Sequence, residues 1–181
     1  MFAISAGVNL ALHHLDVETT FLHGDLDEEI YMEKPPFFVD PKYPHYVCKL
    51  KKSLYGLKQS PRMWLLKLHT YLESIAFKCL QAEPNLYIRK EGKTFILFGV
   101  VSYDLLIASN SIGAMRKIIS QLKMKFSVKD LGPMEFFLSI KVTQNQMEGT
   151  LSISQKKLVE DILQKFDMAD FKPIKTPMTV A

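Results

Sequence analysis

The sequence predicts an α+β domain in which helices pack on one face of an antiparallel sheet. Two pairs of strand-like runs flank Glu-Gly dipeptides, at Glu91-Gly92 and Glu148-Gly149, which is the pattern of β-hairpins. Runs with amphipathic helical spacing lie between and beside these hairpins. The order mixes helices and hairpins and shows no regular βαβ repeat, so we expect one mixed domain without internal repeats or a linker.

The first half of the chain predicts a helix, three short strands and then a longer helix. Residues 2–13 are rich in Ala and Leu and predict a helix that runs into an apolar strand at 12–17. Alternating patterns at 29–33 and 46–50 predict two further strands. Ser60-Pro61 is a strong helix start, because Ser can cap free amides and Pro tolerates the first helical position. One apolar face then continues to about Ala76 through Leu65, Leu68, Leu72 and Ile75.

The second half predicts two hairpins and two helices. Runs at 86–89 and 94–101 form the first hairpin, and a strand at 105–108 follows Asp104 directly. Apolar spacing between Met115 and Phe126 predicts an amphipathic helix. Runs at 134–142 and 150–154 form the second hairpin, and a last helix is expected at about 155–166.

Composition narrows the class of protein. A hydrophobic fraction of 48% over 181 residues is enough for a core and excludes a disordered or fibrous chain. No apolar run approaches the roughly 18 residues that span a bilayer, so we expect no membrane partner. Two cysteines are too few for a disulfide framework and form no zinc motif, which favours a reducing intracellular setting.

Charge is unevenly distributed along the chain, although the net charge is only +4. Residues 1–48 carry eight acidic side chains against two lysines, a net −6, whereas residues 49–78 carry seven basic side chains against one glutamate, a net +6. This asymmetry is compatible with two ordinary solvated surfaces. It is equally the pattern of a cation site next to a polyanion site.

Two aspartates occur inside apolar strand-like runs. Asp16 ends one such run and Asp104 lies within another, 88 residues later. A carboxylate in an apolar hairpin is costly unless it is paired or bound to a cation. Meeting on adjacent strands, the two would supply the hard oxygen ligands that Mg²⁺ prefers. Alternatively, Asp16 caps a turn and Asp104 sits in a strand bend.

Several motifs together resemble the reverse transcriptase of copia-type LTR retrotransposons. The longest is VCKLKKSLYGLKQSPRMW at residues 47–64. The others are LDVETTFLHG at 15–24 followed by EEIYM at 28–32, FSVKDLGPMEFFL at 126–138, and KPIKTPM at 172–178. These motifs occur in the family's order and cover nearly the whole chain.

This resemblance implies a right-hand polymerase palm with part of the fingers, so that residues 1–181 form a partial reverse transcriptase domain. Such enzymes use two Mg²⁺ ions to join a dNTP to the 3′ hydroxyl of a primer. Asp16 matches the first metal-binding aspartate, the Val17 carbonyl would help to hold the nucleotide-bound ion, and Asp104 matches a further metal-binding aspartate. Asp16 and Asp104 are thus the implied catalytic residues.

The resemblance also assigns nucleotide and primer contacts. Phe21 matches the bulky residue that excludes a 2′-hydroxyl, and Gln59 matches a glutamine beside the nucleotide and template. Leu131 and Gly132 fall where the family grips the primer end. Each has a plainer explanation: a core phenylalanine, a polar residue in the turn before the helix, and a tight turn at Leu131-Gly132-Pro133.

The same resemblance implies a role for a run of basic residues. Phosphates of an RNA/DNA template–primer duplex would be neutralised by these side chains, with salt-dependent binding. The residues are Lys49, Lys51, Lys52, Lys58 and Arg62. Trp64 lies among them, but we expect its side chain in the core, on the inner side of the helix.

The sequence departs from the family at the metal motif. Where the family has Tyr-Val-Asp-Asp, this chain has Val101-Ser102-Tyr103-Asp104, so Tyr103 replaces an aspartate that ligates both metals. A phenol is neutral at pH 7 and cannot replace a carboxylate. We therefore expect impaired polymerase activity, and the alternative function is a non-enzymatic remnant that binds nucleic acid. A remnant without any ligand is a third interpretation.

The motif positions also suggest a partial domain. The chain begins just before the Asp16 motif, so we expect the upstream fingers and the downstream ribonuclease H region to be missing. The resemblance implies an intracellular location: the cytoplasmic virus-like particle in the family, with the nucleus as the other compartment.

Overall fold

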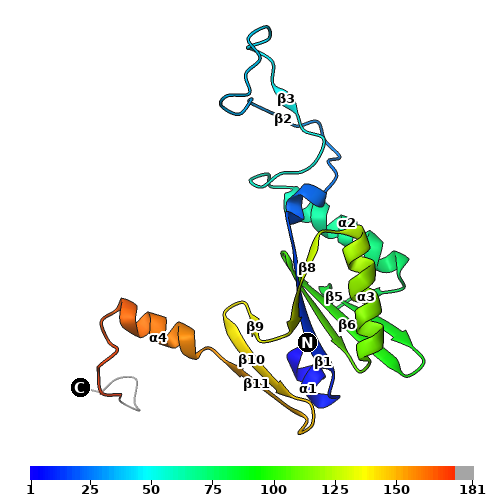
Figure 1. The fold of residues 1–181 in the computed structure, drawn as a ribbon, viewed down its shortest axis with the longest axis vertical. Helices are drawn as coiled ribbons and strands as arrows, with labels where there is room; N and C mark the ends of the chain where they lie inside the picture. Colours follow the sequence, from blue (N-terminus) through cyan, green and yellow to red (C-terminus); the bar gives the residue numbers. More distant parts are fainter. Residues whose placement is uncertain (174–181) are drawn as a thin grey trace. The chain divides into compact units, whose positions relative to one another are not determined.

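The structure is a computed structural model and describes residues 1–173. The chain divides into two compact units, Met1–Pro133 and Met134–Ala181. The described residues form four α-helices and three antiparallel sheets (Figure 1). None of these helices combines the length and apolar character needed to cross a membrane. The last family-like motif, at 172–178, extends outside the described residues.

The first unit is built on a six-stranded antiparallel sheet in the order β4-β5-β6-β7-β1-β8. Its strands are β1 (Ala11–Val17), β4 (Lys78–Leu80), β5 (Glu83–Glu91), β6 (Thr94–Val101), β7 (Asp104–Ser109) and β8 (Val128–Pro133). The central strands β6 and β7 are nearly continuous apolar runs and are almost wholly buried. In the strand order of this sheet, β1 lies between β7 and β8, although it is the first strand in the sequence.

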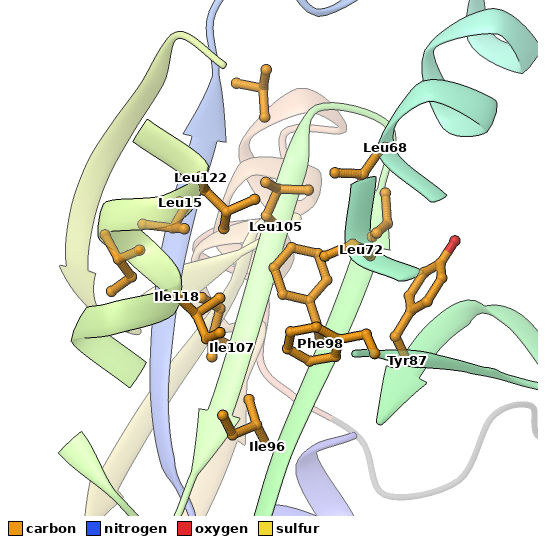
Figure 2. Close-up of a cluster of buried hydrophobic side chains, with 14 of the residues drawn as sticks. Leu15, Leu68, Leu72, Tyr87, Ile96, Phe98, Leu105, Ile107, Ile118 and Leu122 are labelled. Carbon is orange, nitrogen blue, oxygen red and sulfur yellow. The ribbon is translucent and has the colours of Figure 1, made fainter. Parts of the chain in front are cut away.

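Two helices cover one face of this sheet. α2 (Ser60–Ser74) and α3 (Ile112–Lys125) bring Leu68, Leu72, Ile118 and Leu122 against the sheet. Figure 2 shows these side chains around Leu15, Phe98, Leu105 and Ile107. The structure thus has the predicted arrangement, in which helices pack on one face of an antiparallel sheet.

The opposite face meets the N-terminal segment. Gly99 pairs with Leu106 in β7, and the next pair is Val100 with Leu105, which belongs to the core. Because side chains alternate along a strand, Gly99 lies on the opposite face of the sheet. The sulfur of Met1 lies only 3.1 Å from where a Cβ of Gly99 would stand. Gly99 thus allows the chain start, which leads into α1 (Phe2–Gly7), to approach the sheet closely.

The predicted element bounds need several corrections in this unit. The N-terminal helix ends at Gly7, because Asn9 adopts a positive φ of 50° before β1 begins. Only β2 (Tyr31–Met32) and β3 (Cys48–Lys49) form from the two predicted strands, and they pair with each other. A short 3-10 helix, η1 (Thr20–His23), follows β1.

The predicted cap of α2 is also wrong. Gln59 is the N-cap and makes no side-chain cap hydrogen bond, while the Ser60 hydroxyl donates to the Leu54 carbonyl at 2.5 Å. Pro61 does lie in the first turn, as expected. The start of the helix is therefore set by proline and by a loop contact.

The second unit contains a three-stranded sheet and one helix. Its strands, in the order β11-β10-β9, are β9 (Phe136–Phe137), β10 (Ile140–Asn145) and β11 (Thr150–Ser154). The hairpin around Gly149 is confirmed, but the predicted strand at 134–142 is broken, with Leu138 and Ser139 at positive φ. α4 (Lys156–Lys165) matches the predicted last helix within one residue at each end.

Candidate functional site

Asp16 and Asp104 lie directly opposite each other on neighbouring strands. In the register of β1 and β7, Asp16 pairs with Asp104 and the preceding pair is Leu15 with Leu105. Side chains alternate along a strand, so the two leucines enter the helix-covered core and the two aspartates share the other face. Directly paired residues have Cβ atoms about 4.5–5.5 Å apart. Asp16 is a strand residue, so the alternative that it caps a turn is excluded.

Asp104 also has a protein partner, His14. The Nε2 of His14 lies 2.7 Å from Oδ1 of Asp104, and both side chains are largely buried, at 14% and 13% exposure. A carboxylate can only accept a hydrogen bond, so the imidazole is the donor. His14 is not among the site residues predicted from the sequence. Its spacing of two from Asp16, which puts both on one face of β1, was the available signal.

The turn that carries Tyr103 is held from outside the β6–β7 hairpin. Trp64 of α2 donates its indole N–H to the Ser102 carbonyl at 3.1 Å, and the Val17 amide donates to the Tyr103 carbonyl at 3.0 Å. Ser102 adopts a positive φ of 56°, and the Tyr103 side chain remains half exposed. Trp64 itself is 2% exposed, so its expected place in the core is confirmed.

The residues after Asp16 form a compact corner. The Thr20 hydroxyl donates to the Val17 carbonyl at 2.6 Å, so the carbonyl implied as a metal ligand already accepts one hydrogen bond. Phe21 is partly buried against the core, and its ring centroid lies 4.9 Å from that of Tyr55. Phe21 lines a cavity of about 190 Å³, together with Trp64 and Ser102. Phe21 therefore combines a packing contact with one face on a cavity.

Gln59 is half-buried at the start of α2. Its carbonyl accepts from the Met63 amide at 3.0 Å, which closes the first turn. Its side chain makes no cap contact. This backbone position accords with the simpler interpretation of a residue in the turn before the helix, and it leaves the side-chain amide to other contacts.

Leu131 and Gly132 lie on the strand next to Asp16. β8 pairs with β1, with Gly132 opposite His14 and Lys129 opposite Asp16. The register shifts between these pairs, which marks a β-bulge, and Gly132 has a φ of 84° that favours glycine. Leu131 is 43% exposed. Gly132 thus lies opposite His14, two residues along β1 from Asp16.

The predicted basic residues divide into two groups. Lys51, Lys58 and Arg62 are exposed. Lys49 and Lys52 are also exposed, but each pairs with a carboxylate, Lys49 with Glu29 and Lys52 with Asp25.

These contacts lower the pKa of the acidic partners. Asp25 accepts from Lys67 as well, at 2.8 Å. The hydrogen bonds from Lys52 and Lys67 lower the pKa of Asp25 from 3.8 to about 2. The hydrogen bond from Lys49 lowers the pKa of Glu29 in the same direction. The acidic and basic segments are therefore joined by ion pairs, at least in part, and are not two separate solvated surfaces.

Asp16 and Asp104 are the two paired carboxylates at this position of the sheet. Among residues 1–173, no group of three or more His, Cys, Asp or Glu side chains is arranged to hold a metal ion. One Mg²⁺ commonly binds through one or two carboxylates together with substrate phosphates. Tyr103 adds no charge, and one oxygen of Asp104 already accepts from His14.

Comparison with known proteins gives consistent relatives. A sequence profile of the family described as reverse transcriptase (RNA-dependent DNA polymerase) matches residues 1–180. The retrovirus-related Pol polyprotein from transposon TNT 1-94 of Nicotiana tabacum is 38% identical over 179 residues, which is 98% of this chain and 14% of that protein. The corresponding polyprotein from transposon RE1 of Arabidopsis thaliana is 37% identical over 167 residues, 92% of this chain and 11% of that protein.

A yeast relative is shorter. A transposon Ty5-1 protein of Saccharomyces cerevisiae is 32% identical over 164 residues, 91% of this chain and 53% of that protein. The chain therefore spans about a seventh or less of the two plant polyproteins and about half of the yeast protein. With the family profile matching almost every residue, the chain belongs to the reverse transcriptase (RNA-dependent DNA polymerase) family and is similar to part of the Pol polyproteins of copia-type retrotransposons.

Proposed function

We propose that this chain is a palm and partial-fingers segment of a retrotransposon reverse transcriptase that has lost efficient nucleotidyl transfer. The observation that carries the proposal is the pairing of Asp16 with Asp104 while Tyr103 occupies the neighbouring position. The site keeps a carboxylate on each of the two strands but lacks the charge for a second ion. No chemical step is assigned to the chain for that reason.

The exposed basic side chains support binding of an RNA/DNA template–primer duplex. Lys51, Lys58 and Arg62 are exposed and would neutralise phosphates, whereas Lys49 and Lys52 would first have to exchange their carboxylate partners for phosphate. The Leu131–Gly132 turn lies beside the carboxylate face and is a suitable contact for the primer end. Phe21, with its adjoining cavity, and Gln59 are the proposed contacts for a dNTP.

Primer extension tests the catalytic part of the proposal. We expect no incorporation by the natural chain with Mg²⁺ or Mn²⁺ on an RNA template with a DNA primer. Tyr103→Asp restores the missing carboxylate and should raise incorporation, and Asp16→Ala in that background should abolish it again. Incorporation by the natural chain that disappears on Asp16→Ala would overturn the proposed loss of activity.

Duplex binding tests the alternative function, a non-enzymatic remnant that binds nucleic acid. The exposed cations favour this function, because they are available to phosphates without a metal site. The logarithm of the affinity for an RNA–DNA duplex should fall linearly with the logarithm of salt concentration. Lys51→Gln with Lys58→Gln should weaken binding and reduce the salt slope by about two, since each phosphate contact contributes about one. Absence of binding at low salt would exclude this function.

A further inference from the structure

Asp130 connects three elements around the Leu131–Gly132 turn. Its Oδ1 accepts from Nε2 of His13 at 2.6 Å and from the Gly132 amide at 3.1 Å. Its Oδ2 accepts from Nζ of Lys123 at 3.2 Å. One carboxylate thus joins β1, the bulged edge of β8 and the last turn of α3.

These contacts fix the shape of the bulge. Asp130 pairs with Leu15 and Gly132 pairs with His14, so Leu131 is the extra residue. The Gly132 amide contact closes a turn over two residues, of the kind by which Asp side chains mimic a backbone turn. The His13 contact holds that turn to the strand that carries Asp16. Without the carboxylate, the Gly132 amide and His13 both lose their partner at this edge.

The environment of Asp130 favours its charged form. Burial raises the pKa of Asp130, but the hydrogen bonds from His13, the Gly132 amide and Lys123 outweigh burial, so its pKa is lowered. Its side chain is 32% exposed. The Asp130 carboxylate holds its donors and does not face the carboxylate pair, because Asp130 pairs with Leu15, whose side chain enters the helix-covered core.

We propose that Asp130 is a positioning residue: it holds the Leu131–Gly132 turn in the bulged geometry that contacts the terminal nucleotide of a primer. The proposal rests on the duplex binding proposed above and names the residue that shapes this one contact. Asp130 does not touch the nucleic acid itself. Its loss should change how the primer end is held while the phosphate contacts of the basic residues remain.

The test uses the full chain and an RNA–DNA duplex with 2-aminopurine as the 3′-terminal primer nucleotide. Fluorescence at saturation reports the surroundings of the primer end, and anisotropy reports overall affinity. We expect the natural chain to change the terminal fluorescence and to leave an internal 2-aminopurine unchanged. Asp130→Ala should abolish the terminal change while the overall affinity stays within about twofold, because the phosphate contacts dominate affinity.

Two further substitutions separate geometry from charge. Asp130→Asn keeps an oxygen that accepts from the Gly132 amide and from His13, so it should retain the terminal signal. Asp130→Glu keeps the charge but moves it by one methylene, so it should lose the signal. Asp40→Ala is a matched control, since the Asp40 carboxylate accepts the Lys42 amide at 2.8 Å in an equivalent local contact. This control should leave the signal unchanged.

The outcomes distinguish this inference from the function on which it rests. If the natural chain does not bind the duplex, the proposed nucleic-acid binding fails and the inference fails with it. If the chain binds but gives no terminal signal, or if Asp130→Ala and Asp130→Glu keep the signal, the inference alone is overturned. Thermal unfolding of each variant identifies any that fail to fold, and in that case the Asn and Glu pair decides the question.

Discussion

The turn between β6 and β7 is held by hydrogen bonds that come from outside its own hairpin. Ser102 has a left-handed backbone, which costs of order 1 kcal/mol or more for a residue other than glycine. The Trp64 indole and the Val17 amide donate to successive carbonyls of this turn and offset that cost. The position of Tyr103 beside Asp16 therefore depends on α2 and β1 as well as on the turn sequence.

Trp64→Phe should destabilise the protein through this turn. The substitution removes the hydrogen bond to the Ser102 carbonyl and leaves a small cavity at a residue that is 2% exposed. We expect a loss of about 1–3 kcal/mol in the free energy of unfolding. Urea denaturation followed by circular dichroism measures it.

Hydrogen exchange at residues 101–104 adds the local measurement. Amide exchange there should accelerate in Trp64→Phe. Tyr71→Phe provides the control, because the Tyr71 hydroxyl donates to the Gln121 carbonyl at 2.8 Å, away from the turn. An unchanged exchange rate at 101–104 in Trp64→Phe would contradict the proposed support.

At the level of the elements, backbone pairing brings the site residues together. β1 lies between β7 and β8, so Asp16 has Asp104 on one side and Lys129 on the other. A slip of one residue in either pairing would move Asp16 to the core face. The apolar residues under α2 and α3 oppose such a slip, because Leu15 and Leu105 are fully buried.

Leu68→Ala should weaken the packing of α2 that maintains this register. Leu68 is fully buried between α2 and the sheet, and truncating a buried leucine leaves a cavity that costs about 2–5 kcal/mol. Leu66→Ala on the same helix is the matched control, since Leu66 is 56% exposed and should cost less than about 0.5 kcal/mol. Chemical denaturation compares the two. Equal losses would mean that α2 does not pack as described.

Sequence patterns predicted the elements that have a continuous apolar face or run, and missed β4 and β8, the two edge strands of the six-stranded sheet. α2, β6 and the hairpin around Gly92 follow from apolar spacing and turn residues, because their inner faces are continuous. β8 combines Lys129, Asp130 and Gly132 on an edge strand, so it shows no alternating apolar pattern.

The candidate site was predictable only in part for a similar reason. The convergence of Asp16 and Asp104 was expected, and their register confirms it. The contact of His14 with Asp104 joins residues 90 positions apart. It depends on strand order, which no local pattern in the sequence determines. The contact of Asp130 with His13 likewise requires β1 and β8 to be neighbours.

For the whole molecule, the acidic and basic segments of the chain are connected by ion pairs. Asp25 in the acidic segment accepts from Lys52 and Lys67 in the basic segment, and Glu29 accepts from Lys49. These pairs withdraw part of the basic charge from the surface offered to a polyanion. In the proposed nucleic-acid binding, phosphates would compete with Asp25 and Glu29 for these lysines.

Asp25→Asn should therefore change pH dependence and duplex affinity in predictable directions. The folded pKa of Asp25 is about 2 against an ordinary 3.8, so its pairing stabilises the fold above pH 3.8 and this contribution disappears as the pH falls toward 2. The side chain is 66% exposed, so solvent screening limits the loss in Asp25→Asn at neutral pH to less than about 1 kcal/mol. Denaturation between pH 2 and 7 should show a shallower acid decline in the variant.

The same substitution should strengthen duplex binding, because it releases Lys52 and Lys67 to contact phosphates and so steepens the dependence of affinity on salt. Fluorescence anisotropy at several salt concentrations measures this change. The double variant Asp25→Asn with Lys52→Gln is the control and should lose part of the gain. Weaker binding by Asp25→Asn would show that these ion pairs organise the basic surface and do not compete with nucleic acid for it.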